Sequence, residues 1–364
     1  MSDNNLPSLR WGILENQGAG LISSWFVSDL CLERAEATTK HIIQAIGSSS
    51  KEKGSAFATK NCPSHTPNIY GNYDGVYSDP NVDIVYIGTP HTLHCENALA
   101  AIKAGKHVLC EKPLAINSRD SQKMIDAARE KGVFFMEAVW TRFFPIAKKL
   151  HALLHEEKII GDIASVQVDF GLYMPIGEKD ANHRTASRAL GAGALLDIGI
   201  YSLTWASIVL DAAPRRNRDI EPGLSASMLF YSETDPEKKV DEEVAVVLRY
   251  PELKAQAVCT ASLLYKKEED FGQVYGSRGS IAIGGVSASK PGFLVIRVKD
   301  AEEKRIDFEV PGIGFHYEAD AVAEDIRSGR TQSSVCSWDD TLTIMRRMDA
   351  ARAICGLVYP QDEQ

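Results

Sequence analysis

Short apolar runs alternate with segments of helical periodicity through the first 140 residues, and this alternation limits the possible folds more than any other feature. The apolar runs are as short and as continuously hydrophobic as strands that are buried on both faces. They lie at residues 9–14, 41–46, 83–88, 107–110 and 133–138. Strands that are separated by helices predict a parallel, doubly wound sheet. We therefore predict an α/β fold for this part of the chain.

Single residues predict the boundaries of two of the intervening helices. The apolar residues at 95, 98, 99 and 102 fall on one helix face, and Gly105 is expected to end that helix. Ser118 is expected to cap the next helix at its N-terminus, and Gly132 to end it. These helices fill the gaps between the last three apolar runs.

The pattern changes after residue 142 to strands in which apolar and polar residues alternate. Residues 166–172 and 244–250 both follow this pattern, and 275–283 (YGSRGSIAI) is typical of a hairpin. Helical segments at about 193–210, 317–328 and 339–355 interrupt the strands. We predict two domains, 1–142 with the doubly wound sheet and 143–364 of the α+β type. The second domain is expected to hold a large, mostly antiparallel sheet with one face covered.

A glycine-rich loop follows the first apolar run and is the first indication of a ligand. Gly18 and Gly20, with Ser23 at the third small position, approximate the G-x-G-x-x-G fingerprint. Glycines let the backbone approach a pyrophosphate, whose charge is met by the N-terminus of the following helix. We therefore expect a Rossmann-type dinucleotide site, and an ordinary glycine turn is the alternative. The expected contacts are Gly18, Ala19, Gly20, Leu21 and Ile22.

The residues after the second apolar run indicate which dinucleotide binds. NAD sites usually have an acidic residue there, which binds the ribose hydroxyls. This chain instead has three serines followed by Lys51, and these groups can donate to a 2′-phosphate. NADP is therefore the expected cofactor, with Ser49, Ser50 and Lys51 as contacts. A polar surface turn is the alternative, and the nearby Glu52 leaves NAD open.

Two further motifs follow the apolar runs that end near residues 88 and 110. They are GTPH at 88–91 and EKP at 111–113. In an open α/β sheet the carboxyl ends of the strands line the ligand crevice. A lysine directly after a buried strand is poorly placed for solvent, although a surface lysine paired with Glu111 is the alternative. The expected cofactor contacts here are Thr89, Pro90, His94, Glu111 and Lys112.

Four longer segments resemble one family of oxidoreductases. They are DIVYIGTPHTLH (83–94), AGKHVLCEKPLAIN (104–117), EAVWTRFFP (137–145) and GAGALLDIGIYSL (191–203). In this order they make the chain similar to the Gfo/Idh/MocA superfamily. Within this superfamily the four segments are most similar to the branch of dimeric dihydrodiol dehydrogenases and NADP-dependent D-xylose dehydrogenases. The resemblance implies a Rossmann domain, a second α+β domain, and reversible hydride transfer between NADP and a sugar or diol.

By this resemblance Lys112, Asp197 and Tyr201 are catalytic. Oxidation of an alcohol needs a base for the hydroxyl proton as hydride leaves. A free tyrosine with a pKa of ~10 is a poor base at neutral pH, and a neighbouring ammonium lowers that value. Tyr201 with Lys112 beside it is therefore a sensible pair, although Lys112 can also be the acceptor while Tyr201 orients the substrate. A spacing of four puts Asp197 and Tyr201 on one helix face, where Asp197 can bind a sugar hydroxyl or fix Lys112.

Other site residues rest on weaker signals. Trp140, Arg142 and Phe170 match family positions near the nicotinamide or the substrate, although Phe170 is as readily a core aromatic of a strand. His183 and Arg184 belong to a polar loop before the Asp197 helix and are expected to contact substrate. His316 lies in GFHYEAD, which resembles a family segment near the cleft. For these polar residues, a surface or satisfied core position is the alternative.

The chain departs from its branch at the glycine-rich loop. Relatives run from the first strand straight into the small-residue loop, whereas here Glu15, Asn16 and Gln17 stand between Leu14 and Gly18. The loop can bulge outward and leave phosphate binding intact. Alternatively the added acid impairs binding and the chain is a weak enzyme or a non-catalytic, NADP-binding regulatory relative. An error in the gene model is a third explanation.

Charge and cysteine content exclude some classes of protein. A formal net charge of −9 argues against general nucleic-acid binding. We expect no membrane span, no secretory signal and no metal site, because no suitable apolar run or cluster of ligands occurs. The seven scattered cysteines suit a reduced, cytoplasmic protein.

The combined expectation is a cytoplasmic, NADP-dependent dehydrogenase. The leading substrate is an aldopyranose, D-xylose first, which gives the lactone. The rival enzyme is a trans-1,2-dihydrodiol dehydrogenase, in which a cyclic diol undergoes the same hydride transfer. A homodimer through the C-terminal sheet is expected, because an open sheet face with apolar alternation needs a cover.

Overall fold

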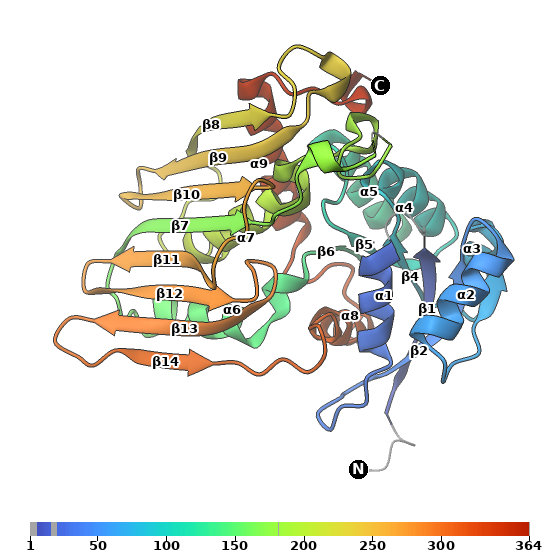
Figure 1. Ribbon diagram of the computed structural model, residues 1–364. Helices are drawn as coiled ribbons and strands as arrows, with labels where there is room; N and C mark the ends of the chain where they lie inside the picture. Colours follow the sequence, from blue (N-terminus) through green and yellow to red (C-terminus); the bar gives the residue numbers. More distant parts are fainter. Residues whose placement is uncertain (1–5, 16–19, 181, 364) are drawn as a thin grey trace. The chain divides into compact units, whose positions relative to one another are not determined.

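The first compact unit holds a six-stranded parallel sheet in the order β3-β2-β1-β4-β5-β6 (Figure 1). The computed structural model describes residues 6–15, 20–180 and 182–363. The strands are β1 (Ser8–Glu15), β2 (Lys40–Gly47), β3 (Asn68–Tyr70), β4 (Ile84–Gly88), β5 (His107–Glu111) and β6 (Phe135–Ala138). This order is that of a doubly wound dinucleotide-binding sheet. The predicted α/β class and Rossmann-type sheet are thereby confirmed.

Helices separate the strands of this sheet. They are α1 (Gly20–Leu30), α2 (Lys51–Asn61), α3 (Asp74–Ser78), α4 (His94–Lys103) and α5 (Ser118–Lys131). All five residues of β4 are buried, as expected for a strand covered on both faces. Gly132 ends α5 in the left-handed conformation, with φ of 71°. The predicted cap is one residue off, because the side chain of Asn117, and not that of Ser118, accepts from the Asp120 N–H.

The chain returns to the first unit near its C-terminus. Residues 1–140 and 311–342 form the first unit, and 141–310 with 343–364 form the second. The sequence analysis placed all of 143–364 in the second domain, so 311–342 is the difference. Its helix α8 (His316–Arg327) and the start of α9 (Trp338–Cys355) are the next elements in sequence after β14 (Lys304–Asp307). Sequence periodicity shows such helices but not which sheet they pack against.

The returning segment seals the edge of the first sheet. The Phe135 N–H of β6 donates to the Thr331 carbonyl at 3.0 Å. The Trp338 indole N–H donates to the Phe135 carbonyl at 2.9 Å. Both bonds satisfy backbone groups that an edge strand would otherwise leave unpaired.

An eight-stranded sheet forms the second unit, in the order β14-β13-β12-β11-β7-β10-β9-β8. Its strands are β7 (Ile163–Gly171), β8 (Gly223–Phe230), β9 (Asp241–Tyr250), β10 (Ala255–Ser262), β11 (Asp270–Gly276), β12 (Gly279–Gly285), β13 (Pro291–Val298) and β14 (Lys304–Asp307). Only the β7–β10 pair is parallel among the described strand pairs of this sheet. The predicted α+β unit with a mostly antiparallel sheet is therefore confirmed.

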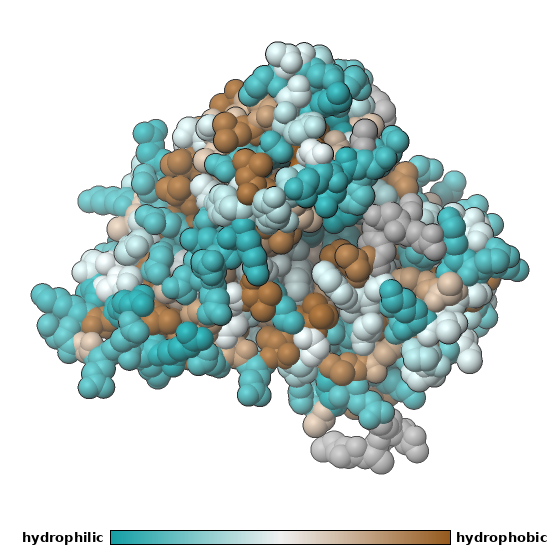
Figure 2. All heavy atoms as spheres, viewed as in Figure 1, coloured by the Kyte–Doolittle hydropathy of each residue, from teal (hydrophilic) through white to brown (hydrophobic). Residues whose placement is uncertain are grey.

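The two faces of this sheet differ. Helical residues 195–206, which include α7 (Ile200–Ala206), and α6 (Pro145–His151) pack on one face, next to buried residues such as Val166 and Val246. On the other face Val247 and Val258 lie directly across from each other and are partly exposed. Figure 2 shows hydrophobic patches among hydrophilic side chains over β8–β14.

One helical stretch of the second unit, Arg188–Asp211, is long and apolar enough to cross a membrane. However, 94% of its apolar window is buried within the protein. The core helix of a soluble protein meets the same criterion, so this stretch is weak evidence for a membrane span. The expectation of no membrane span stays a prediction.

Candidate active site

The carboxyl ends of β1 and β4 lie side by side where the strand order reverses, which is where ligands bind in such sheets. The first turn of α1 approaches β4 so closely that a Cβ on Gly88 would lie 2.1 Å from the Ser23 hydroxyl oxygen. A small residue is therefore required at both positions. Gly20 begins α1, with Leu21 exposed and Ile22 partly buried behind it. The predicted contacts Gly18 and Ala19 lie outside the described residues.

Glu15 is the last residue of β1 rather than part of the following loop. Its side chain is buried, and its backbone carbonyl accepts from the Tyr73 hydroxyl at 3.2 Å. Burial raises the pKa of Tyr73 to about 12, and the Glu15 carboxylate adds to the rise. The chain therefore places an acidic side chain inside the protein at the end of this strand. Asn16 and Gln17, the other two extra residues, lie outside the described part of the chain.

Hydroxyl groups gather after β2. Ser48 is buried and its hydroxyl oxygen has no hydrogen-bond partner among the described residues. Ser50 caps α2 by accepting from the Lys53 N–H at 3.3 Å, and the Lys53 ammonium donates to the Ser49 hydroxyl at 3.0 Å. Lys51 is exposed in the first turn of α2. The sequence analysis missed Lys53, although its spacing of four from Ser49 on a helix was the available signal.

His94 connects the loops that follow β4 and β5. Its ring nitrogens Nε2 and Nδ1 each lie 2.9 Å from a carbonyl oxygen, of Thr89 and Pro113 respectively. Burial lowers the pKa of His94. The Thr89 hydroxyl accepts from Asn97 at 3.1 Å, and Pro90 begins a short 3₁₀ turn. His94 therefore holds the two loops together, and its contact with a cofactor stays a prediction.

Lys112 follows β5 and is buried, with 7% of its surface exposed. Its backbone N–H donates to the Glu111 carboxylate at 3.2 Å, and the Tyr86 hydroxyl donates to the same carboxylate at 2.7 Å. Burial raises the pKa of Glu111 to about 7, against the opposing effect of the Lys112 charge. The alternative of an exposed surface lysine is thus excluded. Lys112 and Glu111, whose carboxyl has a pKa of about 7, are therefore adjacent at the ligand-binding edge of the sheet.

Two predicted residues of the first unit have aromatic or acidic neighbours. Trp140 is buried and stacks on Phe315, with ring centroids 4.3 Å apart. His316 is buried on α8, where Nδ1 lies 3.7 Å from the Asp29 carboxylate. Asp29 also accepts from the Gly314 and Phe315 N–H groups at the start of α8. His316 therefore has an acidic neighbour within the first unit, and its contact with substrate stays a prediction.

In the second unit the fold brings four predicted residues together in two pairs. An Arg184 guanidinium nitrogen lies 3.6 Å from a carboxylate oxygen of Asp197. Tyr201 is buried, and its ring lies 5.7 Å from that of Phe170 on β7. Asp197 belongs to a π-helical turn, 195–199, that passes into α7. Single π turns inside helices recur at functional sites, and the spacing of four did not predict this one.

Asp241 of β9 anchors that π turn. Its carboxylate is buried and accepts from the Leu195 N–H at 2.6 Å. The other carboxylate oxygen would lie 1.9 Å from a Cβ on Gly193, so glycine is needed there. Burial raises the pKa of Asp241 to about 7. The sequence analysis missed this residue because its partner is more than forty positions away.

The remaining predicted residues have local contacts. His183 is exposed, and its Nδ1 lies 2.8 Å from the Thr185 hydroxyl in the same loop. The Arg142 guanidinium donates to the Ser207 hydroxyl at 3.3 Å. No group of three or more His, Cys, Asp or Glu that could hold a metal ion occurs in the described ranges.

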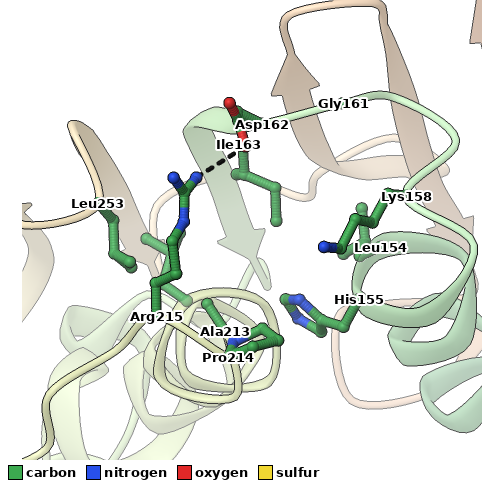
Figure 3. Close-up of a pocket in the computed structure, with 11 residues that line it drawn as sticks. Leu154, His155, Lys158, Gly161, Asp162, Ile163, Ala213, Pro214, Arg215 and Leu253 are labelled. Atoms are coloured by element: carbon green, nitrogen blue, oxygen red, sulfur yellow. Dashed lines mark hydrogen bonds and ion pairs between the residues drawn. The ribbon is translucent and has the colours of Figure 1, made fainter.

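A pocket of the second unit lies away from these residues (Figure 3). His155, Lys158 and apolar side chains line it, and Arg215 forms an ion pair with Asp162 at its rim, at 2.7 Å. Leu210, also in the lining, follows Asp197 by more than three helical turns, about 20 Å by the usual helical rise. The pocket therefore contains none of the predicted site residues.

The described residues of the first unit fit a dinucleotide. The close packing of Ser23 on Gly88 is the small-residue contact that brings a helix N-terminus to the strand ends. Ser48 offers a buried hydroxyl after β2 that has no hydrogen-bond partner in the described part of the chain, and Lys53 adds a positive charge nearby. Fold and strand-end chemistry together define a dinucleotide-dependent oxidoreductase.

Comparisons with known proteins identify the family. Residues 18–139 match a family model described as "Oxidoreductase family, NAD-binding Rossmann fold", and residues 148–282 match the "GFO/IDH/MocA C-terminal domain". The chain belongs to the Gfo/Idh/MocA oxidoreductase family and is an oxidoreductase with an NAD(P)-binding domain.

Curated relatives align along almost the whole chain. D-xylose 1-dehydrogenase (NADP(+)) of Hypocrea jecorina is 28% identical over 384 aligned residues, covering 99% of this chain and 95% of the relative. Trans-1,2-dihydrobenzene-1,2-diol dehydrogenase of Danio rerio is 33% identical, covering 98% of this chain and all of the relative. Among solved structures, aldose-aldose oxidoreductase from Caulobacter crescentus is 26% identical with a TM-score of 0.79, covering 96% of this chain and 98% of that one.

Proposed function

We propose that this protein is an NADP-dependent dehydrogenase that oxidises the CH–OH group of an aldopyranose, with D-xylose as the first candidate. The observation that carries this proposal is the buried Lys112 beside Glu111 at the carboxyl edge of the dinucleotide-type sheet. The full-length similarity to an NADP-dependent D-xylose dehydrogenase supports the substrate class. When bound, the nicotinamide cofactor accepts the hydride from the carbon that is oxidised.

The side chains of this chain would handle the proton and the orientation of the substrate. Lys112 supplies a positive charge that favours the developing oxyanion. Tyr201 is the proposed acceptor of the hydroxyl proton; in the alternative, Lys112 accepts the proton as a neutral amine and Tyr201 orients the substrate. Asp197, paired with Arg184, is an acceptor for a neighbouring sugar hydroxyl. The burial of Lys112 and Tyr201 keeps bulk water from their polar atoms.

NADP is proposed over NAD because no acid lies in the serine run after β2. Ser49, Ser50 and Lys51 are the contacts predicted from the sequence, and Lys53 is added by the structure. The Glu52 carboxylate is exposed, and its pKa is lowered by hydrogen bonds to its own backbone N–H and to Ser50. Glu52 lies in the first turn of α2, where the helix dipole favours a negative charge.

A trans-1,2-dihydrodiol dehydrogenase is the second candidate. The favouring observation is that relatives with this name are 32–33% identical, above the 28% of the xylose enzyme. A cyclic diol would be oxidised by the same hydride and proton transfers, so the same residues would serve both substrates.

Calorimetric titration with NADP and with NAD tests the cofactor. We expect selective binding of NADP by the purified protein, followed by turnover of D-xylose in a screen of aldoses and cyclic diols. Turnover of the diol alone would favour the second candidate. Absence of binding to either dinucleotide by the folded protein would overturn the proposal, and deletion of residues 15–17 would then show whether the lengthened loop is the cause.

A further inference from the structure

An acidic side chain of α8 is enclosed in the interior of the first unit. Glu318 has no exposed surface, and neither of its carboxylate oxygens has a hydrogen-bond partner among the described residues. It lies on the buried face of α8 together with Phe315, Ala319 and Val322. An acid on an apolar helix face is unusual, because burial of an ionised carboxylate is costly unless it is paired.

Ring contacts link the Glu318 face of α8 to the residues around the proposed active-site lysine. Phe315, three positions before Glu318, lies edge-on to Phe26 with ring centroids 6.1 Å apart, and Phe26 stacks on Tyr86 at 3.8 Å. The Glu111 charge raises the pKa of Glu318, and the Glu318 charge raises the pKa of Tyr86. Glu111 in turn contacts the Lys112 backbone and the Tyr86 hydroxyl. Glu137 of β6 also raises the pKa of Glu111, the Glu111 charge raises the pKa of Cys110 of β5, and the Lys112 charge lowers the pKa of His94 of α4.

Most of these neighbours cannot neutralise a charge on Glu318. Glu137 already accepts from the Leu114 N–H and the Thr341 hydroxyl. Both ring nitrogens of His94 lie 2.9 Å from carbonyl oxygens, and burial lowers its pKa. The Lys112 charge lowers the pKa of Glu111 and is not among the groups that lower the pKa of Glu318. Burial, and then the neighbouring Glu111, raise the pKa of Glu318 well above its usual range.

We propose that Glu111 and Glu318 form a coupled carboxyl pair that carries one proton, which stays on Glu318, and that Glu318 is a positioning residue for Lys112. Uncharged Glu318 leaves Glu111 as the carboxylate that accepts from the Lys112 backbone. Ionisation of Glu318 at high pH adds a further negative charge, which opposes the oxyanion that develops during oxidation. The second half of this inference rests on the proposed role of Lys112.

The first test measures the proton itself and needs no turnover. Infrared difference spectroscopy of the full-length protein at about pH 8, where ordinary carboxyl groups are ionised, is expected to show a protonated carboxyl band. Glu318→Gln should remove this band. Glu324→Gln, a change on the exposed side of the same helix, should leave it in place. A wild-type spectrum without the band, or a band that persists in E318Q, would overturn the proposal.

Coupling is tested with Glu111→Gln. Removal of its charge should let Glu318 ionise at lower pH, so the band should disappear at least about half a pH unit earlier than in the wild type. An unchanged midpoint would mean that the two carboxyls are independent, which contradicts the pair.

The second test is the pH profile of kcat/KM with NADP and the best substrate. E318Q should extend activity to higher pH by at least about half a unit, while E324Q should follow the wild type. A loss of activity in E318Q by the same factor at every pH would show a merely structural role. Lys112→Met separates the two proposals: turnover that survives this change overturns the role of Lys112, whereas the infrared result decides on the carboxyl pair.

Discussion

Individual side chains show where sequence reasoning about the site succeeds. Glu111 and Lys112 could be placed at a ligand-binding edge because a buried strand directly precedes them, and strand ends can be predicted from one local pattern. Glu318 could not be paired with Glu111, because about 200 residues separate them and no periodicity reports which sheet a helix covers. The acid on the apolar face of α8 was the only local signal.

Tyr201 carries the first prediction at this scale. Tyr201→Phe removes the hydroxyl and keeps the ring packing against Phe170. We expect kcat to fall by about 100-fold or more, with little change in the dissociation constant of NADP measured by calorimetry. Phe170→Leu is the matched control for the packing, and near-normal turnover of Y201F would contradict the assignment.

Lys53 carries the second prediction. Its ammonium donates to the Ser49 hydroxyl. From this position it can also donate a charge-assisted hydrogen bond to the 2′-phosphate of NADP. Lys53→Ala should weaken NADP binding by about tenfold and leave NAD binding unchanged. Lys60→Ala, near the end of the same helix, is the control. An equal loss of affinity for NADP and NAD would mean that Lys53 does not bind the 2′-phosphate.

At the scale of elements, the strands and helices were largely predictable and their local geometry was not. Buried positions 166, 168, 244, 246 and 248 follow the predicted alternation. The π turn at 195–199 and its anchor Asp241 were missed, because the wider turn depends on a tertiary hydrogen bond. The region from 51 to 78 was also left unassigned, since α2, β3 and α3 are short and polar.

Asp241, which anchors the π turn at 195–199, makes the stability of the folded protein dependent on pH. Its pKa is raised from 3.8 to about 7 in the folded state, so it favours folding at low pH, and this contribution is lost as the pH rises through about 7. Asp241→Asn keeps an acceptor for the Leu195 N–H and cannot ionise. The wild type should therefore lose stability relative to D241N between about pH 4 and pH 7, as measured by chemical denaturation. A constant difference across this range would show that Asp241 is already ionised in the fold.

At the scale of the whole molecule, the open face of the eight-stranded sheet carries apolar side chains that the described residues leave partly exposed. Val247 of β9 and Val258 of β10 lie opposite each other on this face, and Leu229 on β8 is 55% exposed. We propose that a second copy of the chain covers this face, as the alternation of its strands predicted. Apolar positions on a solvated sheet face favour such pairing.

A charge among the apolar residues of that face should prevent the pairing. Val258→Lys is expected to convert the dimer to a monomer in light scattering coupled to gel filtration, because an unpaired ammonium would be buried. Val286→Lys, at a 76% exposed position after β12, is the control. A wild type that is already a monomer at micromolar concentration would refute the proposed dimer.

The return of residues 311–342 to the first unit also has a consequence for biosynthesis. Domains generally begin to fold as they leave the ribosome, the N-terminal one first. Here β6 remains an open edge until Thr331 and Trp338 have been made, which is after the entire second sheet. The first unit therefore cannot be completed during synthesis of its own N-terminal part. A nascent chain halted before residue 311 would display an unprotected strand, and that stage is when we expect the protein to be most prone to aggregation and most dependent on chaperones.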